Sequence, residues 1–398
     1  MTGIATLALA YVLSQFYRSF LAVLTPSLIA DLGIDKAGLS AASGAYFIAF
    51  ALAQFPVGVF LDRFGPRRTA AAIMTLGGAG GAFLFSAATA PWMITAAMAM
   101  IGVGCAPILM ASLFIFAKSY SPARFAVLAS WMVAFGSTGN IIGAAPLAAA
   151  AEAFGWRASM AGLGIVTLLV AVAVLFVVRD PESDGRGDGA GLSGYLELLR
   201  MRVLWAIIPL AALNYAPPMG IRALWAGPYL ADTYGADAIA IGQATLYMAF
   251  AMAAGAFIYG PLDTLFRTRK WVAFVGNAVG VAALAWLALY PVTTIAASSA
   301  AFVVIGLFGG SYGLLMAHAR AFLPSHLTGR GVTLMNFFSI GGVGAMQFAT
   351  GAVVTAATVP GDPAAAYRML FLFYAVTLVV ALVAYLPAKD AKPAATGH

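Results

Sequence analysis

The chain has 398 residues, of which 63% are hydrophobic and only 9% are charged, and its formal net charge is +7. Soluble domains contain about 25% charged residues, so this composition excludes a water-soluble globular protein. The apolar residues occur in runs as long as the roughly 20 residues needed to cross a bilayer, and the segment 271–317 has no acidic residue at all. The sequence therefore predicts an all-α integral membrane protein.

Twelve apolar segments follow one another along the chain, and each is predicted to form a transmembrane helix. Their approximate bounds are 5–30, 38–61, 70–90, 92–117, 127–150, 158–178, 203–231, 239–262, 272–290, 294–319, 332–357 and 367–387. The hydrophilic, glycine-containing stretch 179–202 separates six segments from six and is typical of a linker. We expect a six-helix bundle at 1–178, a cytoplasmic linker at 179–202, and a pseudo-symmetric second bundle at 203–398 with a short cytoplasmic tail.

The basic residues fall mainly on one side of the predicted membrane. Of the 21 Lys and Arg residues, 16 lie in the loops after even-numbered segments or in the tail, and three lie in the other loops. We expect a multi-pass protein of a bacterial inner membrane, and the positive-inside rule predicts that both termini are cytoplasmic. The positive charge is then a topology signal, so no nucleic-acid partner is expected. A cleavable signal peptide is not expected, because the first apolar run is too long and lacks a basic region before it.

The two halves repeat each other at the ends of their segments. Residues 26–31 close the first segment with Pro-Ser-Leu-Ile-Ala-Asp, and residues 228–232 close the seventh with Pro-Tyr-Leu-Ala-Asp. After the second segment comes the run 58–68, and the similar run 260–270 follows the eighth. Duplicated six-helix halves are the layout of alternating-access carriers, whose substrate site lies near the membrane midplane between the halves.

The run 58–68 resembles the loop signature that follows the second helix in the major facilitator superfamily. The resemblance implies that its acidic and basic residues latch the cytoplasmic helix ends in one of two states. The residues expected to act in gating or coupling are Gly58, Asp62, Arg63, Gly65 and Arg67. A basic loop that only orients the chain in the membrane is the alternative interpretation. The run 136–143 in the fifth segment partly resembles the antiporter motif of the superfamily, although small residues at this spacing also allow close helix packing.

Arg18 is a cation inside the first segment. A charged side chain near the bilayer centre costs about 2.5–3.5 kcal/mol on insertion scales, so it suggests a functional site. Ser14, Gln15 and Thr25 share its helix face and form a polar stripe. All 14 acidic residues lie in loops or at segment edges, so the expected counter-charge of Arg18 is an anionic substrate. A buried structural ion pair is the alternative.

Arg222 occupies the equivalent segment of the second half. Its polar neighbours are Asn214, Tyr215 and Trp225, and the pair at 217–218, Pro-Pro, predicts a helix break just before it. An interrupted helix at a repeat interface is a pointer to a binding site. Alternatively, Arg222 extends its charged end toward the outer membrane surface.

Five further polar residues complete the prediction. Tyr46, Tyr247, Asn336 and Gln347 are expected to line the substrate path, although each also suits a hydrogen bond between helices. His318 is a candidate coupling or gating residue because imidazole titrates near physiological pH. A cap at the cytoplasmic end of its helix is the simpler alternative for His318.

The residues around Arg18 also resemble two anion-carrying branches of the superfamily. Arg18 stands eight residues before Pro26, as in the first helix of the organophosphate:inorganic-phosphate antiporters, and His318 and Pro324 match a spacing in the same branch. The following Leu-Ala-Val run is similar to the anion:cation symporters. The second arginine of the antiporters corresponds to Gly220 here, two residues before Arg222.

The predicted function is secondary active transport of a small organic anion, either a carboxylate or a phosphate ester, by alternating access. A coupling proton or a counter-anion is left open as the second partner. No metal site, cofactor or enzymatic activity is expected, since the chain has one Cys and three His, and a monomer is expected. Two alternatives remain: a broad-specificity exporter of drugs or metabolites, and a receptor that binds an anion without transporting it.

Overall fold

The computed structural model describes residues 2–181, 193–324 and 327–391, and the regular elements in these ranges are helices. Ten of the helical stretches are long and apolar enough to cross a membrane, and the count rises to 11 if one bent helix pair forms a single span. The predicted all-α membrane class is confirmed. Among the described residues, these stretches correspond to eleven of the twelve predicted segments, all except the fifth, 127–150.

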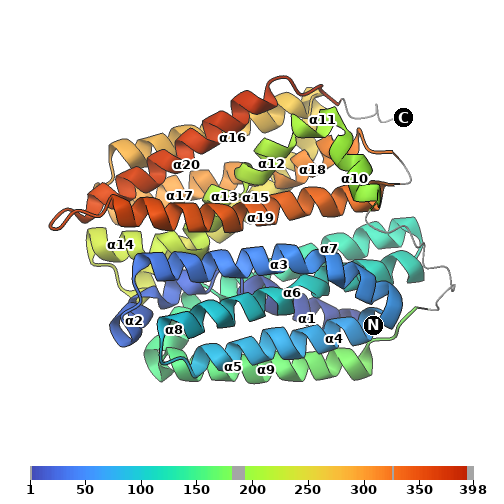
Figure 1. The fold of residues 1–398 in the computed structure, drawn as a ribbon, viewed down its shortest axis with the longest axis horizontal. Coiled ribbons are helices and arrows are strands. Elements are labelled where there is room, and N and C mark those ends of the chain that lie inside the picture. The colour runs from blue at the N-terminus through green and yellow to red at the C-terminus, as the bar shows by residue number, and fades with distance from the viewer. Residues whose placement is uncertain (1, 182–192, 325–326, 392–398) are drawn as a thin grey trace. The chain divides into compact units, whose positions relative to one another are not determined.

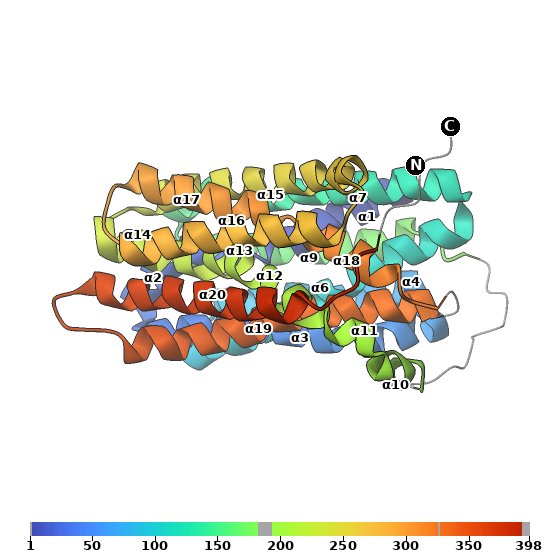
Figure 2. The same cartoon turned by 90° about the horizontal axis from the view of Figure 1, so that it is seen from above.

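The chain divides into two compact units. The first unit comprises Met1–Gly189, Ala223–Ala231 and Ala236–Leu246, and the second comprises Ala190–Arg222, Asp232–Gly235 and Tyr247–His398. In both units the long helices run side by side (Figures 1 and 2). The boundaries predicted at 178 and 203 stay a prediction.

Up to residue 181 the first unit contains nine α-helices and one π-helix, η1. In chain order they are α1 (Thr2–Phe16), α2 (Leu21–Leu32), α3 (Lys36–Phe64), α4 (Pro66–Ile73), η1 (Met74–Ala79), α5 (Gly80–Ser86), α6 (Pro91–Ser119), α7 (Pro122–Ile142), α8 (Ala145–Phe154) and α9 (Trp156–Val177). The predicted fifth segment is thus divided between α7 and α8. The break lies at Gly143 and Ala144, directly before Pro146 in the first turn of α8.

The first predicted span is also two helices. α1 and α2 meet at an angle of 51°, and Tyr17–Phe20 form the turn between them. Aromatic packing holds this turn, because the rings of Phe16 and Phe20 stack with centroids 5.9 Å apart. The Tyr17 hydroxyl also shares a 2.8 Å hydrogen bond with the Thr167 hydroxyl of α9. The bend places Arg18 in a turn rather than in a regular helix.

The second half begins with the short helix α10 (Ser193–Arg200), which falls inside the predicted linker range. The following elements are α11 (Arg202–Trp205), α12 (Ile208–Asn214), α13 (Ala216–Gly220), the π-helix η2 (Ile221–Trp225), α14 (Ala226–Tyr234), α15 (Ala238–Phe266), α16 (Lys270–Leu289), α17 (Ile295–Gly309), α18 (Tyr312–Arg320), α19 (Thr328–Ala356) and α20 (Pro363–Tyr385). As expected, the seventh span is interrupted before Arg222: Tyr215 separates α12 from α13, and Pro217 and Pro218 occupy the first turn of α13.

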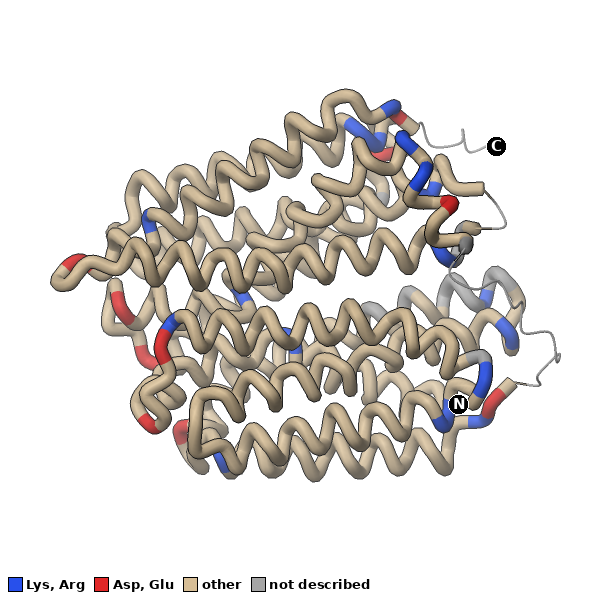
Figure 3. Tube along the Cα trace, viewed as in Figure 1, with Lys and Arg blue, Asp and Glu red and all other residues tan. Residues whose placement is uncertain are grey.

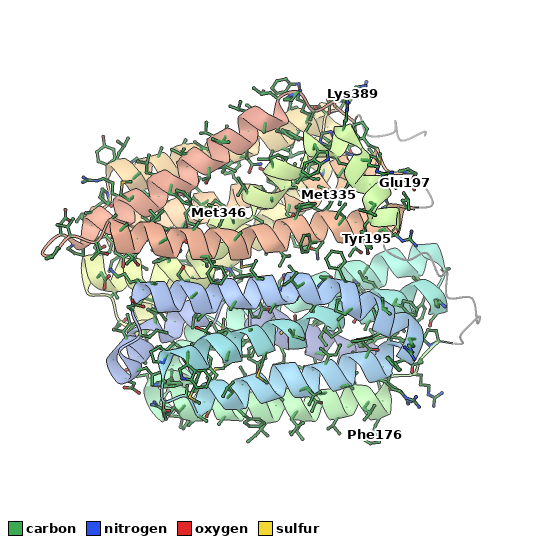
Figure 4. All side chains as sticks on the ribbon, in the orientation of Figure 1. Phe176, Tyr195, Glu197, Met335, Met346 and Lys389 are labelled. Carbon is green, nitrogen blue, oxygen red and sulfur yellow. The ribbon has the colours of Figure 1, made fainter. Side chains whose placement is uncertain are left out.

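The surface of the helices is suited to lipid. On α9 the exposed side chains include Val166, Leu169 and Phe176, spaced so that they share one face, and Figure 4 shows Phe176 projecting from this helix. Lys and Arg, in contrast, gather at one end of the long helices in each unit (Figure 3). An apolar flank with a basic end is the pattern of helices that cross a bilayer.

Candidate functional site

Arg18 lies in the turn between α1 and α2 and is half-buried in the first unit. Its guanidinium carbon is 4.7 Å from the centre of the Phe50 ring of α3. A cation over an aromatic face gains about 0.5–2 kcal/mol, more where water is excluded. The bend between α1 and α2 therefore places a positive charge against the middle of α3, where the Phe50 ring supports a guanidinium whose N–H groups suit a planar anion.

Three more side chains belong to the same cluster of the first unit. The Ser14 hydroxyl donates to the backbone carbonyl of Cys105 at 3.4 Å, and the buried Tyr46 hydroxyl is directed at both the Cys105 thiol and Arg18. The residues come from α1, α3 and α6, which pack together in the first unit. The structure thus brings together three predicted site residues, Ser14, Arg18 and Tyr46, and adds Cys105, which was not predicted.

Gln15 points to a different neighbour. Its side-chain amide donates to the hydroxyl of Tyr11 at 2.9 Å, one turn earlier on α1. A methyl group on Gly136 of α7 would contact the Tyr11 ring and lie 3.3 Å from Gln15. Gln15 therefore lies on the α1 face that meets α7, and the glycines that partly resemble the antiporter motif allow α7 to approach that face closely.

Arg222 lies in the π-helical turn η2 and is only 2% exposed. One of its terminal nitrogens is 3.6 Å from the sulfur of Met219. The alternative in which Arg222 extends into the outer interface does not fit this burial. π-helical turns inside α-helices frequently occur at functional sites.

The turn before Arg222 is closely packed by side chains of α19 and α20. The Gln347 amide donates to the carbonyl of Gly220 at 3.3 Å, and a methyl group on Gly220 would contact the hydroxyl of Tyr374. The Tyr374 hydroxyl therefore fills the space next to position 220, where the antiporters have their second arginine. Gln347, a predicted site residue, lies beside the turn that carries Arg222.

The other predicted residues of the second unit fall into two groups. Asn214 donates to Asn277 at 3.1 Å and to Ser311 at 2.7 Å, so it belongs to a buried network that joins α12 to α16 and the start of α18. Tyr215 packs on Tyr312 with ring centroids 5.5 Å apart, and the Tyr312 hydroxyl donates to Asn336 at 2.6 Å. The hydrogen bonds of Asn214 thus connect helices to one another, a role that was not predicted for this residue.

Two predicted aromatic residues have opposite environments. Trp225, in η2, is fully buried, whereas Tyr247, on α15, is 54% exposed. The fused ring of Trp225 is therefore part of the packing around the π-helical turn. Tyr247 presents most of its ring at the surface of its helix.

The loop 58–68 is held by an acid that was not predicted. Gly65 adopts φ 81°, a left-handed conformation that favours glycine, and ends α3 next to the first turn of α4. Asp180, just after α9, accepts from the backbone N–H of Arg67 at 2.8 Å and lies 3.6 Å from its guanidinium. Arg63 is exposed, and its guanidinium carbon lies 5.3 Å from the centre of the Phe64 ring. A methyl group on Gly58 would meet open space. The side chain of Asp62 lies outside the described residues.

The second half repeats this arrangement. Asp390, after α20, accepts from the backbone N–H groups of Arg269 at 3.2 Å and Lys270 at 3.0 Å, and from the Thr268 hydroxyl at 2.6 Å. Partial burial by itself would raise the pKa of Asp390, but these hydrogen bonds outweigh it and hold the pKa below its ordinary value. Asp180 thus holds the start of α4, and Asp390 holds the start of α16. These two helices begin the third predicted span of their respective halves.

His318 is tied to the same end of the second unit. One ring nitrogen is 2.6 Å from the Tyr385 hydroxyl, and the other is 2.8 Å from the carbonyl of Lys389. The imidazole is fully buried and joins α18 to the end of α20 and the segment after it. These contacts are those of a residue that fastens helix ends together.

The opposite helix ends also carry matched contacts. Asp31 accepts from Trp156 and from Arg157, both at 2.8 Å, at the start of α9. In the second unit, Asp232 accepts from Tyr367 at 2.5 Å near the start of α20. The acids that end the repeated Pro-to-Asp segments therefore bond to the last helix of their own half.

A sequence model named Major Facilitator Superfamily matches residues 7–221, more than half of the chain. The chain belongs to the Major Facilitator Superfamily. The resemblance drawn from the run 58–68 is confirmed. Asp180 is then the partner that fastens the superfamily's loop signature within the first unit of this member.

Two curated relatives are distant in sequence. The chain is 28% identical over 186 residues to a probable hexose phosphate transport protein of Chlamydia trachomatis, a match that covers 44% of this chain and 39% of that protein. It is 25% identical over 348 residues to the membrane sensor protein UhpC of Salmonella typhimurium, covering 79% and 76% of the two chains. The first relative is therefore matched over only about two fifths of its length.

Solved structures agree in fold along almost the whole chain. A bacterial homologue of the human lysosomal transporter Spinster, in an inward-facing and unoccupied conformation, superposes with a TM-score of 0.79 at 17% identity over 97% of this chain and 96% of that one. A D-xylose–proton symporter gives a TM-score of 0.75 at 14% identity over 99% and 98%. At these identities the likeness concerns the superfamily fold alone.

One cavity of the first unit has a volume of about 490 Å³ and apolar walls from α1, α7, α8 and α9. Its lining includes Phe16, Ile142, Leu147, Phe154 and Leu163. None of the predicted site residues lines it, so it is not the candidate anion site.

Proposed function

We propose that this superfamily member is a secondary carrier that moves a small organic anion across a bacterial inner membrane by alternating access. The observation that carries the proposal is the position of Arg18 in a helix break, with Phe50 beneath it and Tyr46 and Cys105 beside it. A charge at such a depth marks a functional site. A guanidinium binds carboxylates and phosphates through paired N–H donors, so an anion bound and released at Arg18 explains its presence.

The distribution of acids supports an anionic rather than a cationic substrate. Among the acidic residues that the structure describes, those outside the short helix α10 lie in loops or within a few residues of helix ends. The described ion pairs Arg67–Asp180, Arg157–Asp31 and Arg269–Asp263 are correspondingly at helix ends. In the described part of the chain, the middle of the long helices thus offers guanidinium and hydroxyl donors and no carboxylate.

The nature of the anionic group is a finer part of the proposal. A guanidinium fork suits carboxylate and phosphate equally well. The distant similarity to a probable hexose phosphate transport protein favours a phosphate ester as the first candidate. Position 220 is a glycine, so the second arginine of the antiporters has no counterpart at that position.

An anion receptor is the second candidate. Among the relatives described, the one matched over most of the chain is a membrane sensor protein, at 79% of this chain. A receptor would bind the same anion at Arg18 without moving it. The binding site is therefore common to both proposals, and transport separates them.

Binding is tested first, by thermal unfolding of purified protein in detergent. The panel contains sugar phosphates, glycerol phosphate, mono- and dicarboxylates, amino acids and neutral lipophilic drugs. An anion present at about 100 times its Kd should stabilise the wild type by about 2.7 kcal/mol. Arg18→Gln should lose this stabilisation, and Arg18→Lys should lose most of it because the bidentate fork is gone.

The matched control is Lys118→Gln, which removes one positive charge from the exposed last turn of α6. It should keep the full stabilisation. Unfolding temperature without ligand and elution volume establish that each variant is folded. Stabilisation by lipophilic compounds alone, unchanged in Arg18→Gln, would contradict the proposal and support the exporter.

Transport is tested with the anion that binds best. Protein reconstituted in liposomes loaded with unlabelled anion should accumulate labelled anion by counterflow, and Arg18→Gln should not. Binding without counterflow in well-sealed liposomes would favour the receptor. A pH gradient imposed in the same assay reports whether a proton is coupled.

A further inference from the structure

Cys105 is the single cysteine of the sequence and lies in the middle of α6. Its side chain is 4% exposed. The helices that pack around it supply Ser14 from α1 and Tyr46 from α3, and the α1–α2 turn supplies Arg18. The thiol therefore lies beside the Tyr46 hydroxyl and within the electrostatic influence of the Arg18 guanidinium.

Tyr46 gives an independent indication that a ligand belongs here. Its hydroxyl is buried, since the residue is 1% exposed, and it is aimed at the Cys105 thiol and Arg18. Within the described part of the chain this hydroxyl has no hydrogen bond of regular geometry. A buried donor left in that state costs about 1–3 kcal/mol, and buried polar groups in native structures nearly always have a partner.

The cluster can offer donors from three side chains to a single acceptor. Arg18 has guanidinium N–H groups, Tyr46 has an O–H, and Cys105 has a weak S–H donor. The Ser14 hydroxyl is already directed to the carbonyl of Cys105, so it fixes the position of that residue on α6. Donors that converge with no carboxylate among them are suited to an oxyanion.

We propose that Arg18, Tyr46 and Cys105 form an oxyanion subsite, in which the Cys105 thiol touches the bound anionic group. This proposal rests on the proposed function and adds a substrate-contacting residue to it. Arg18 supplies the charge, Tyr46 supplies a directed donor, and Cys105 sets the size of the subsite. Because the wild type has one cysteine, its thiol also reports directly on this subsite.

The test uses the charge of thiol reagents. Purified full-length protein is treated with an anionic reagent, sulfonatoethyl methanethiosulfonate, and with its cationic trimethylammonium counterpart. Each reagent forms a disulfide with the Cys105 thiolate and releases methanesulfinate. Modification is followed by intact mass, and each rate is divided by the rate of the same reagent with 2-mercaptoethanol.

A subsite governed by Arg18 should favour the anionic reagent at least tenfold. Arg18→Gln should abolish this preference, and Lys118→Gln, which removes a charge elsewhere on α6, should keep it. Inorganic phosphate or acetate should slow modification by the neutral reagent N-ethylmaleimide in the wild type, compared with chloride at equal ionic strength. Equal normalised rates for the two charges, or no modification by any reagent, would overturn the proposal.

Two substitutions of Cys105 separate contact from packing. Cys105→Ser keeps a donor and should retain binding of the anion found in the thermal panel within about threefold. Cys105→Val fills the position without a donor and should weaken binding at least tenfold while the unliganded protein stays folded. Equal binding by both variants would mean that the thiol does not touch the anion.

These outcomes are distinct from failure of the proposed function. If a panel anion still binds in an Arg18-dependent manner but Cys105 shows no charge preference, the carrier proposal stands and the subsite is wrong. If the charge preference is present and no anion in the panel stabilises the protein, the subsite stands and the organic-anion function is wrong.

Discussion

Gly104 and Gly162 form a matched pair for testing how tightly the first unit is packed. Gly104 lies on α6, and a methyl group there would contact the backbone nitrogen of Gly78 in η1. The reverse contact is also close, since a methyl group on Gly77 would be 2.6 Å from the nitrogen of Gly104. Gly162 lies on α9, and a methyl group there would have nothing within 4 Å. A side chain is therefore excluded at position 104 by the backbone of η1, whereas the space at position 162 would accept one.

We expect Gly104→Ala to destabilise the protein by about 1–3 kcal/mol, because the backbones of η1 and α6 must separate. Gly162→Ala should be neutral or stabilising by up to about 1 kcal/mol, because alanine favours a helix over glycine. Thermal unfolding in detergent measures both changes. Equal effects of the two substitutions would show that the close crossing of η1 and α6 does not limit stability.

Arg18 was predictable as a candidate site residue because the cost of a charge in an apolar segment is a local property of the sequence. Ser14, four residues earlier, was predicted to lie on the same side of the chain, so its place in the cluster was predictable as well. Cys105 was not predictable, because it reaches Arg18 only through the packing of α6 against α1 and α3. Its signal in the sequence, a lone thiol within a span, has no meaning until the neighbouring helices are known.

At the scale of elements, the acids after α9 and α20 explain how the loop signature is held. Each stands beyond the last helix of its half and accepts backbone N–H groups at the start of α4 or α16. The sequence assigned Asp180 to the linker and Asp390 to the tail, because pairing across such long stretches of chain leaves no local pattern. The repeated basic loops themselves were visible from the sequence.

The depressed pKa of Asp390 predicts a pH effect. A carboxyl whose folded pKa is below its unfolded value stabilises the fold above the unfolded pKa and loses that contribution as the pH falls. Wild-type protein should therefore lose thermal stability as the pH falls from about 5 toward about 3, across the ordinary range of carboxyl pKa values. Asp390→Asn should be less stable at neutral pH and should show a smaller loss on acidification.

Thr268→Val is the companion variant for that measurement. It removes the hydroxyl that donates to Asp390 at 2.6 Å and keeps the carboxyl and the two backbone donors. Its acid sensitivity should lie between those of the wild type and Asp390→Asn. Identical pH profiles for all three proteins would mean that Asp390 does not stabilise the start of α16.

The helix breaks divide into expected and unexpected ones for a physical reason. Pro217 and Pro218 predicted the interruption before Arg222, because proline removes a backbone donor. The turn at Tyr17–Phe20 contains neither proline nor glycine, and it is fixed by aromatic packing and by the bond from Tyr17 to Thr167. Tertiary contacts of this kind cannot be inferred from the local sequence.

At the scale of the whole molecule, the charge distribution predicts the orientation in the membrane. Lys and Arg concentrate at one helix end in each unit (Figure 3), and the positive-inside rule makes this end cytoplasmic. A fluorescent protein fused after residue 391 should therefore fluoresce, and alkaline phosphatase fused there should be inactive.

The comparison site for those fusions is the segment between α16 and α17, residues 290–294. Alkaline phosphatase inserted there, after truncation of the rest, should be active because the segment is expected on the outer side. Phosphatase activity at the C-terminus would contradict the proposed orientation and with it the assignment of the basic loops to the cytoplasm.

The matched acids of the two halves bear on how the chain arose. Asp31 and Asp232 end corresponding helices, yet one accepts from an indole and a guanidinium and the other from a phenol. Asp180 and Asp390 likewise collect different sets of donors for the same task. If the halves descend from one duplicated gene, each acceptor aspartate was kept in both halves, while the residues that donate hydrogen bonds to it changed.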